Sequence, residues 1–89
     1  MASIYDRQVK AKAEEIKAFI EETCDLNGIA IDEIDISTSW PNGTVTVYLE
    51  EDSPYNQGQV CGAVRSHFSG IEYEYEDNDM IIFSFRIRS

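Results

Sequence analysis

Basic residues are scarce in the middle of this 89-residue chain. Residues 21–79 contain 14 acidic residues and a single basic one, Arg65, which gives the segment a net charge of −13. Contacts with DNA or RNA phosphates need lysine and arginine, so direct binding of nucleic acid is disfavoured. An anionic membrane surface is disfavoured for the same reason.

Long apolar runs are also missing. No run approaches the roughly 20 residues of a membrane-spanning helix. The N-terminal stretch MASIYDRQVKAKAEE is charged and lacks the apolar segment of a secretion signal. We therefore expect a cytoplasmic protein. A hydrophobic content of 43 % and ten aromatic residues are enough for a core, and the length suits one domain over residues 1–89.

Signatures of catalysis and of metal binding are absent from the sequence. The chain has one histidine, His67, and no GxSxG, P-loop, HExxH or GxGxxG pattern. The stretch DNDM resembles the start of a calcium loop, but it lacks the glycine and the later glutamate of an EF-hand. We therefore expect no cofactor and no enzyme. An enzyme would need a ligand-sized pocket around His67.

The two cysteines, Cys24 and Cys61, show no CxxC pair and no paired Cys/His spacing, so a zinc site is not expected. Each falls on the apolar stripe of a predicted helix. We interpret both as buried thiols that act as small hydrophobes, with a disulfide as the alternative.

Apolar residues at intervals of three and four predict a helix over about residues 4–27. Ser3 is its expected N-cap, and Gly28 is its expected left-handed C-cap. The helix stripe consists of Val9, Ala13, Ile16, Ile20 and Cys24.

Alternation of apolar and polar residues predicts a hairpin from IDEIDISTSW and TVTVYLEE. A two-residue turn at Asn42-Gly43 would pair Ile36 with Leu49 and would set Asp35 opposite Glu50. A four-residue loop is the alternative, because Pro41 lacks an N–H. Its length is also even, so the same residues would face inward. The residues expected to face inward are Ile34, Ile36, Thr38 and Trp40 on the first strand and Val45, Val47 and Leu49 on the second.

A second helix is predicted from Ser53 as N-cap and Pro54 at the first helical position, ending at Gly70. Its inward stripe consists of Gln57, Val60, Cys61, Val64 and Phe68. Gly58 and Gly62 lie one turn apart inside this helix. Our first interpretation is close packing on the sheet or on the first helix, and the second is a backbone surface open to a partner.

The stretch IEYEYEDNDMIIFSF predicts a second hairpin with a three-residue loop over residues 77–79. Tyr75 then faces Ile81, and Tyr73 faces Phe83. The outer face of this hairpin carries Glu72, Glu74 and Glu76 beside Ser84, Ile82 and Met80.

The predicted order is α-β-β-α-β-β, and the predicted fold class is α+β. The simplest architecture is a two-layer sandwich, a four-stranded antiparallel sheet with both helices on one face. The other face of the sheet then meets water or a partner.

Acidic residues gather in three clusters on the predicted strands. Like charges opposite each other destabilise a sheet, so we predict that the clusters bind a partner, with solubility and edge protection as the alternative. Side chains on one strand face repeat at about 6.6–6.8 Å, close to the gap between successive phosphates, so such a ladder can occupy a basic groove built for nucleic acid. The predicted partner-binding residues are Asp32, Glu33 and Asp35, then Glu50, Glu51 and Asp52, then Glu72, Glu74, Glu76, Asp77 and Asp79, with Tyr48 as an apolar anchor.

The acidic runs IDEID, LEED and EYEYEDND, in a small compact chain, resemble the inhibitors that bacteriophages aim at host nucleic-acid-binding defence proteins, namely DNA mimics and anti-CRISPR proteins. The resemblance implies a non-enzymatic protein in the host cytoplasm that blocks the nucleic-acid channel of a CRISPR effector or a restriction complex. Those inhibitors share no common sequence, so the resemblance assigns no residue roles. The basic first helix departs from a uniformly acidic mimic and favours a one-sided binding surface.

The leading hypothesis is a protein-binding inhibitor, a monomer or homodimer whose acidic sheet face engages a basic nucleic-acid-binding protein. The alternative is a bacterial structural or adaptor domain. It would self-associate through a sheet edge or through the Gly58/Gly62 helix face, with the acidity serving solubility.

Overall fold

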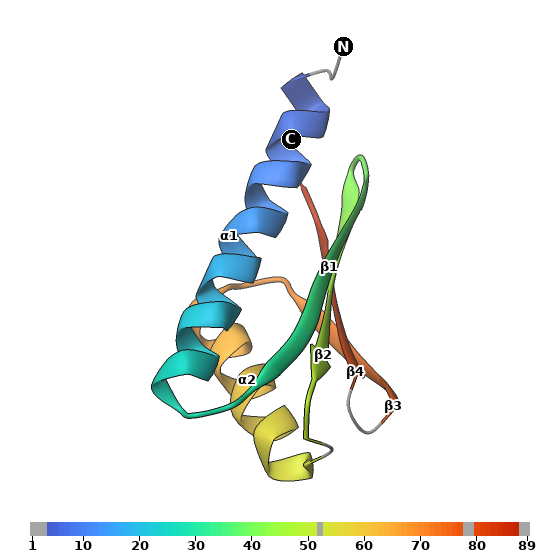
Figure 1. Cartoon of the computed structure of the whole chain (residues 1–89). Helices are drawn as coiled ribbons and strands as arrows, with labels where there is room; N and C mark the ends of the chain where they lie inside the picture. Colours follow the sequence, from blue (N-terminus) through green and yellow to red (C-terminus); the bar gives the residue numbers. More distant parts are fainter. Residues whose placement is uncertain (1–3, 52, 78–79, 88–89) are drawn as a thin grey trace.

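The computed structural model describes residues 4–51, 53–77 and 80–87, which form two helices and four strands (Figure 1). The strands make one antiparallel sheet in the order β1-β2-β4-β3, and both helices lie on the same face of it. The predicted α+β fold and its α-β-β-α-β-β order are therefore confirmed. The elements are α1 (Ile4–Leu26), β1 (Ile31–Ser39), β2 (Asn42–Leu49), α2 (Pro54–His67), β3 (Glu72–Asp77) and β4 (Met80–Arg86).

Helix α1 ends as the sequence predicts. Gly28 has a positive φ of 67°, a conformation that glycine adopts without steric cost. The N–H of Gly28 donates to the carbonyl of Asp25 at 3.4 Å, and the N–H of Ile29 donates to the carbonyl of Cys24 at 2.8 Å. These two bonds form a Schellman motif, which satisfies carbonyls left open at the helix end. The predicted N-cap, Ser3, lies outside the described residues.

Helix α2 begins at the predicted cap. The Ser53 hydroxyl accepts a hydrogen bond from the Asn56 N–H at 3.3 Å, and Pro54 occupies the first turn. The helix ends at His67, and Phe68 is already extended, so the end comes before the predicted Gly70. All five residues of the predicted stripe are buried, including the polar Gln57.

The two glycines inside α2 are exposed. A Cβ built on Gly58 or on Gly62 would meet no atom within 4 Å. The first interpretation, close packing against the sheet or α1, is therefore wrong. The second interpretation was a backbone surface open to a partner. The structure shows that this stretch of helix backbone is uncovered, and binding of a partner there stays a prediction.

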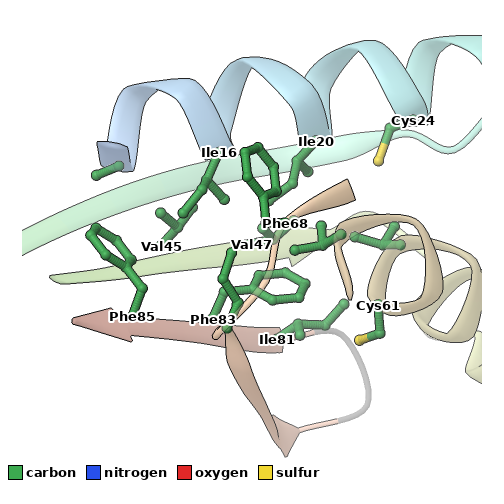
Figure 2. Close-up of a cluster of buried hydrophobic side chains, with 14 of the residues drawn as sticks. Ile16, Ile20, Cys24, Val45, Val47, Cys61, Phe68, Ile81, Phe83 and Phe85 are labelled. Atoms are coloured by element: carbon green, nitrogen blue, oxygen red, sulfur yellow. The ribbon is translucent and has the colours of Figure 1, made fainter. Parts of the chain in front are cut away.

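The core lies between the helices and the two central strands. Figure 2 shows Ile16 and Ile20 of α1 close to Val45 and Val47 of β2, with Ile81 and Phe83 of β4 in the same layer. Cys24 and Cys61 are free thiols buried in this cluster, as predicted. The full cluster is Val9, Ala13, Ile16, Ile20, Cys24, Ile29, Val45, Val47, Leu49, Val60, Cys61, Val64, Phe68, Ile71, Ile81, Phe83 and Phe85.

The register of the first hairpin differs from the prediction. Ser39 pairs with Asn42, so the turn residues are Trp40 and Pro41. The peptide bond between them is cis, which makes this a type VI turn. Ile34 and Ile36 still face inward, but their partners change, because Ile36 lies opposite Val45 and not opposite Leu49.

Two residues predicted to face inward on the first strand do not join the core. Trp40 belongs to the turn and keeps 39 % of its surface exposed. Thr38 is exposed as well. The core contribution of β1 is therefore smaller than predicted and comes from Ile31, Ile34 and Ile36, which are half-buried against the main cluster.

The register of the second hairpin agrees with the prediction. Tyr75 pairs with Ile81, and Tyr73 pairs with Phe83. Asp77, which the sequence placed in the loop, is the last residue of β3 and pairs with Met80 across a local irregularity. The other two predicted loop residues, 78 and 79, lie outside the described residues.

Candidate partner-binding surface

The face of the sheet that the helices leave uncovered has a half-buried centre. It is formed by alternate residues of the two central strands, whose neighbours on either side point into the core. The centre consists of Thr44, Thr46 and Tyr48 on β2 and of Met80, Ile82 and Ser84 on β4, all half-buried. The surface therefore offers methyl, thioether and phenol groups to a partner.

Acidic residues of the two edge strands border this centre on both sides. The pairing places Asp35 beside Thr46, Thr46 beside Ile82, and Ile82 beside Glu74, so one row crosses the whole sheet. Strands are spaced at about 4.8 Å, so the two acidic edges lie roughly 14 Å apart. The bordering carboxylates are Glu33 and Asp35 on β1 and Glu72 and Glu74 on β3, and all four side chains are exposed.

The carboxylates of β1 repel each other along the strand. The pKa of Glu33 is raised above 4.5, chiefly by the charge of Asp35, with smaller contributions from desolvation, a hydrogen bond to Asp35 and the charge of Asp32. Glu33 and Asp35 are two residues apart, so they share one face of β1. This crowding is an electrostatic cost that a cationic partner would relieve.

The predicted opposition of Asp35 and Glu50 is wrong. With the turn at Trp40 and Pro41, Asp35 lies opposite Thr46, and Glu50 comes after the end of β2. The like-charge repulsion on this hairpin runs along β1 and not across the strand pair.

The remaining predicted residues fall at one end of the sheet or outside the described part. The N–H of Glu50 donates to the carbonyl of Ala30 at 3.1 Å, which fixes Glu50 beside the start of β1. Glu51 and Asp32 are exposed there. Tyr48 lies opposite Glu33 and is half-buried.

The side chains of four predicted partner-binding residues lie outside the described part of the chain. Glu76 and Asp77 belong to β3, but their side chains lie outside the described part of the chain. Asp52 and Asp79 lie outside it altogether. The structure thus brings together Glu33, Asp35, Glu72, Glu74 and Tyr48 on one face.

His67 belongs to an aromatic cluster on the helix side. Its ring stacks on Phe19 with centroids 4.2 Å apart and meets the edge of Phe68 at 4.7 Å. A hollow of about 450 Å³ adjoins it and is also lined by Glu15 and Glu22. The polar residues of its lining are Glu15, Glu22, Thr23 and His67.

Within residues 4–51, 53–77 and 80–87, no group of three histidine, cysteine or acidic side chains is arranged to hold a metal ion. None of the helices there is both long enough and apolar enough to cross a membrane.

Sequence reasoning missed a second feature, at the opposite end of the sheet from Glu33. There Lys12, Trp40 and Arg86 line a hollow of about 980 Å³. The concentration of basic residues at the two ends of the sequence was a signal for a basic region. The position of this hollow depends on the turn at Trp40 and Pro41, whereas the sequence predicted the turn at Asn42 and Gly43.

No protein-family model matches this chain, and no curated protein matches it either.

Proposed function

We propose that the chain is a non-enzymatic protein-binding inhibitor whose uncovered sheet face docks on the basic, nucleic-acid-binding surface of a host defence protein. One observation carries this proposal: exposed carboxylates line both edges of a half-buried centre. The partner is a basic protein such as a CRISPR effector or a restriction complex, in the host cytoplasm.

The arrangement supports a protein partner in two ways. The carboxylates attract a cationic surface and speed the encounter, an effect that salt screens. The centre supplies contact area, with Tyr48 as the side chain of a type that is enriched at binding hot spots. A fully solvated acidic face would gain nothing from the half-buried Ile82 and Met80 between its edges.

Capture from a bacterial lysate, followed by elution with duplex DNA, tests this function. Wild-type chain should retain a protein that itself binds DNA, and DNA or high salt should release it. The double variant Glu72→Gln/Glu74→Gln should retain it at least about tenfold more weakly, because two charge-assisted contacts are lost. The purified partner should lose DNA binding when wild-type chain is added.

The matched control is Glu14→Gln/Glu15→Gln, which removes the same charge from exposed positions on α1. It should bind like wild type. If both double variants weaken binding equally, the partner reads net charge and the sheet face is not the site. Retention that neither salt nor DNA disturbs would overturn the proposal.

The second candidate is a structural or adaptor domain that associates with copies of itself. The exposed backbone at Gly58 and Gly62 favours it, since close helix contact requires small residues. Sedimentation at low and high salt separates the two candidates. A dimer that is insensitive to salt and is disrupted by Gly58→Leu would favour self-association.

A further inference from the structure

The hollow at the basic end of the molecule is bounded by four separate parts of the chain. These are α1, the β1–β2 turn, the segment after α2 and the end of β4. Its volume of about 980 Å³ lies at the upper end of the range for small-molecule sites. The lining residues are Lys12, Trp40, Pro41, Ser69, Gly70, Phe85, Arg86 and Ile87.

The charge of this hollow is opposite to that of the rest of the chain. Its charged lining residues are Lys12 and Arg86, and none of the described residues that line it is acidic. The full chain has a net charge of −10. The pairing of Arg86 with Asn42 places this cation at the far end of β2 from Tyr48 and Glu33.

Contacts within the protein hold the Lys12 side chain and the backbone beside Arg86 in place. The Nζ of Lys12 lies 4.6 Å from the centroid of the Phe68 ring, a cation–π contact that directs the side chain toward the segment after α2. The N–H of Ile87 donates to the carbonyl of Pro41 at 2.7 Å, which ties the end of β4 to the turn. The backbone at Arg86 is therefore fixed next to the turn that carries Trp40.

The hollow also offers an aromatic surface. Trp40 leaves 39 % of its surface exposed, and the buried ring of Phe85 lies beside it in the lining. A flat ring can stack on an indole, and an attached anion can then reach a lysine or an arginine. The acidic sheet face has no cation on β1 or β3 and cannot serve an anion in this way.

We propose that this hollow binds a small anion that carries an aromatic ring. The ring packs against Trp40, and the phosphate or carboxylate group contacts Lys12 and Arg86. This site is separate from the partner-binding surface and does not depend on its function.

The chain has a single tryptophan, so the indole N–H of Trp40 gives one signal in a ¹H–¹⁵N NMR spectrum. We expect this signal to shift and saturate with adenosine monophosphate, with phenylacetate or with both, which distinguishes the phosphate source from the carboxylate source. Inorganic phosphate and adenosine, each with half of the recognised chemistry, should bind at least about tenfold more weakly. If neither aromatic anion moves the signal, or if phosphate alone binds as well, the proposal is wrong.

Variants that each remove one positive charge, inside or outside the lining of the hollow, test where the anion binds. Lys12→Gln and Arg86→Gln should each weaken binding about tenfold. Lys10→Gln removes the same charge from the same helix at an exposed position outside the lining, and it should change affinity less than about twofold. Equal losses in all three variants would show a response to net charge alone and would overturn the site. The dispersion of the amide signals checks the fold of each variant.

Discussion

Gly43 of β2 lies directly against the ring of Phe85, its pairing partner on β4. A Cβ built on Gly43 would lie 2.8 Å from Cε1 of Phe85, closer than side chains approach each other. The ring of Phe85 would have to shift to admit this carbon. Gly43 does not have a positive φ. Packing across the sheet, and not a turn, therefore requires glycine at this position.

Gly43→Ala should destabilise the fold by roughly 1–3 kcal/mol, because the added methyl clashes with the Phe85 ring and displaces it from its place in the core. Urea unfolding of wild type and variant measures the difference. A variant with unchanged stability would mean that Phe85 swings away at no cost. Gly43→Ala combined with Phe85→Leu tests that directly, since the smaller side chain should recover part of the loss.

The same substitution at Gly58 or at Gly62 should have the opposite effect. Both residues lie inside α2 with open space where a Cβ would stand. Alanine restricts the unfolded chain and favours the helix, so each change should stabilise the fold by about 0.5–1 kcal/mol. Thermal unfolding measures it. A destabilised variant would show that the α2 backbone is covered, for instance by a second copy of the chain.

The helices could be predicted from the sequence because their signals are local. The α1 stripe, the Gly28 cap and the Ser53-Pro54 start each act within a few residues, and the structure confirms them. The alternation of apolar and polar residues at odd and even positions also predicted which residues of β2 and β4 face the core. These features need no knowledge of the rest of the molecule.

The register of the first hairpin could not be fixed in this way. Any even-length turn keeps the same residues inward, so parity does not distinguish the pairing of Ile36 with Leu49 from its pairing with Val45. The sequence Pro41-Asn42-Gly43 suggested a turn at Gly43, whereas Gly43 is needed where β2 meets Phe85. That contact joins residues far apart in the chain, so local signals do not contain it.

The candidate site was predictable in composition but not in geometry. The acidic residues of β1 and β3 were identified from alternation alone. These acidic residues border the half-buried centre of the sheet face on two sides because the strand order is β1-β2-β4-β3. This order joins the two hairpins through β2 and β4. The basic hollow depends on the same packing and on the position of Trp40.

Burial raises the pKa of the Cys24 thiol from 9.0 to about 11. The reactive thiolate should therefore be about 100-fold less populated at pH 8 than in an ordinary cysteine. In a Cys61→Ala variant, which leaves Cys24 as the single thiol, a thiol reagent should react slowly with native protein and rapidly in urea. Fast reaction without urea would contradict the burial of Cys24 in the core.

The same shift predicts a loss of stability in alkali. The folded pKa of Cys24 exceeds the unfolded one, so its contribution is complete below about pH 9 and is lost as the pH rises toward about 11. The melting temperature of wild type should fall over this window. Cys24→Ala has no thiol to ionise at this position, so its melting temperature should fall less. Parallel curves would show that other groups dominate.

The raised pKa of Glu33 should fall when Asp35 is neutralised, because Asp35 is its largest cause. Carbon NMR titration of the Glu33 carboxyl in Asp35→Asn measures it, and Asp32→Asn should lower the pKa less. The contribution of Glu33 to the stability of the fold is complete below its unfolded pKa and is lost as the pH rises through the higher folded pKa.

A basic partner on the sheet face favours the charged carboxylate, so the pKa of Glu33 should fall in the complex. If the pKa of Glu33 is unchanged on binding, the partner does not approach β1.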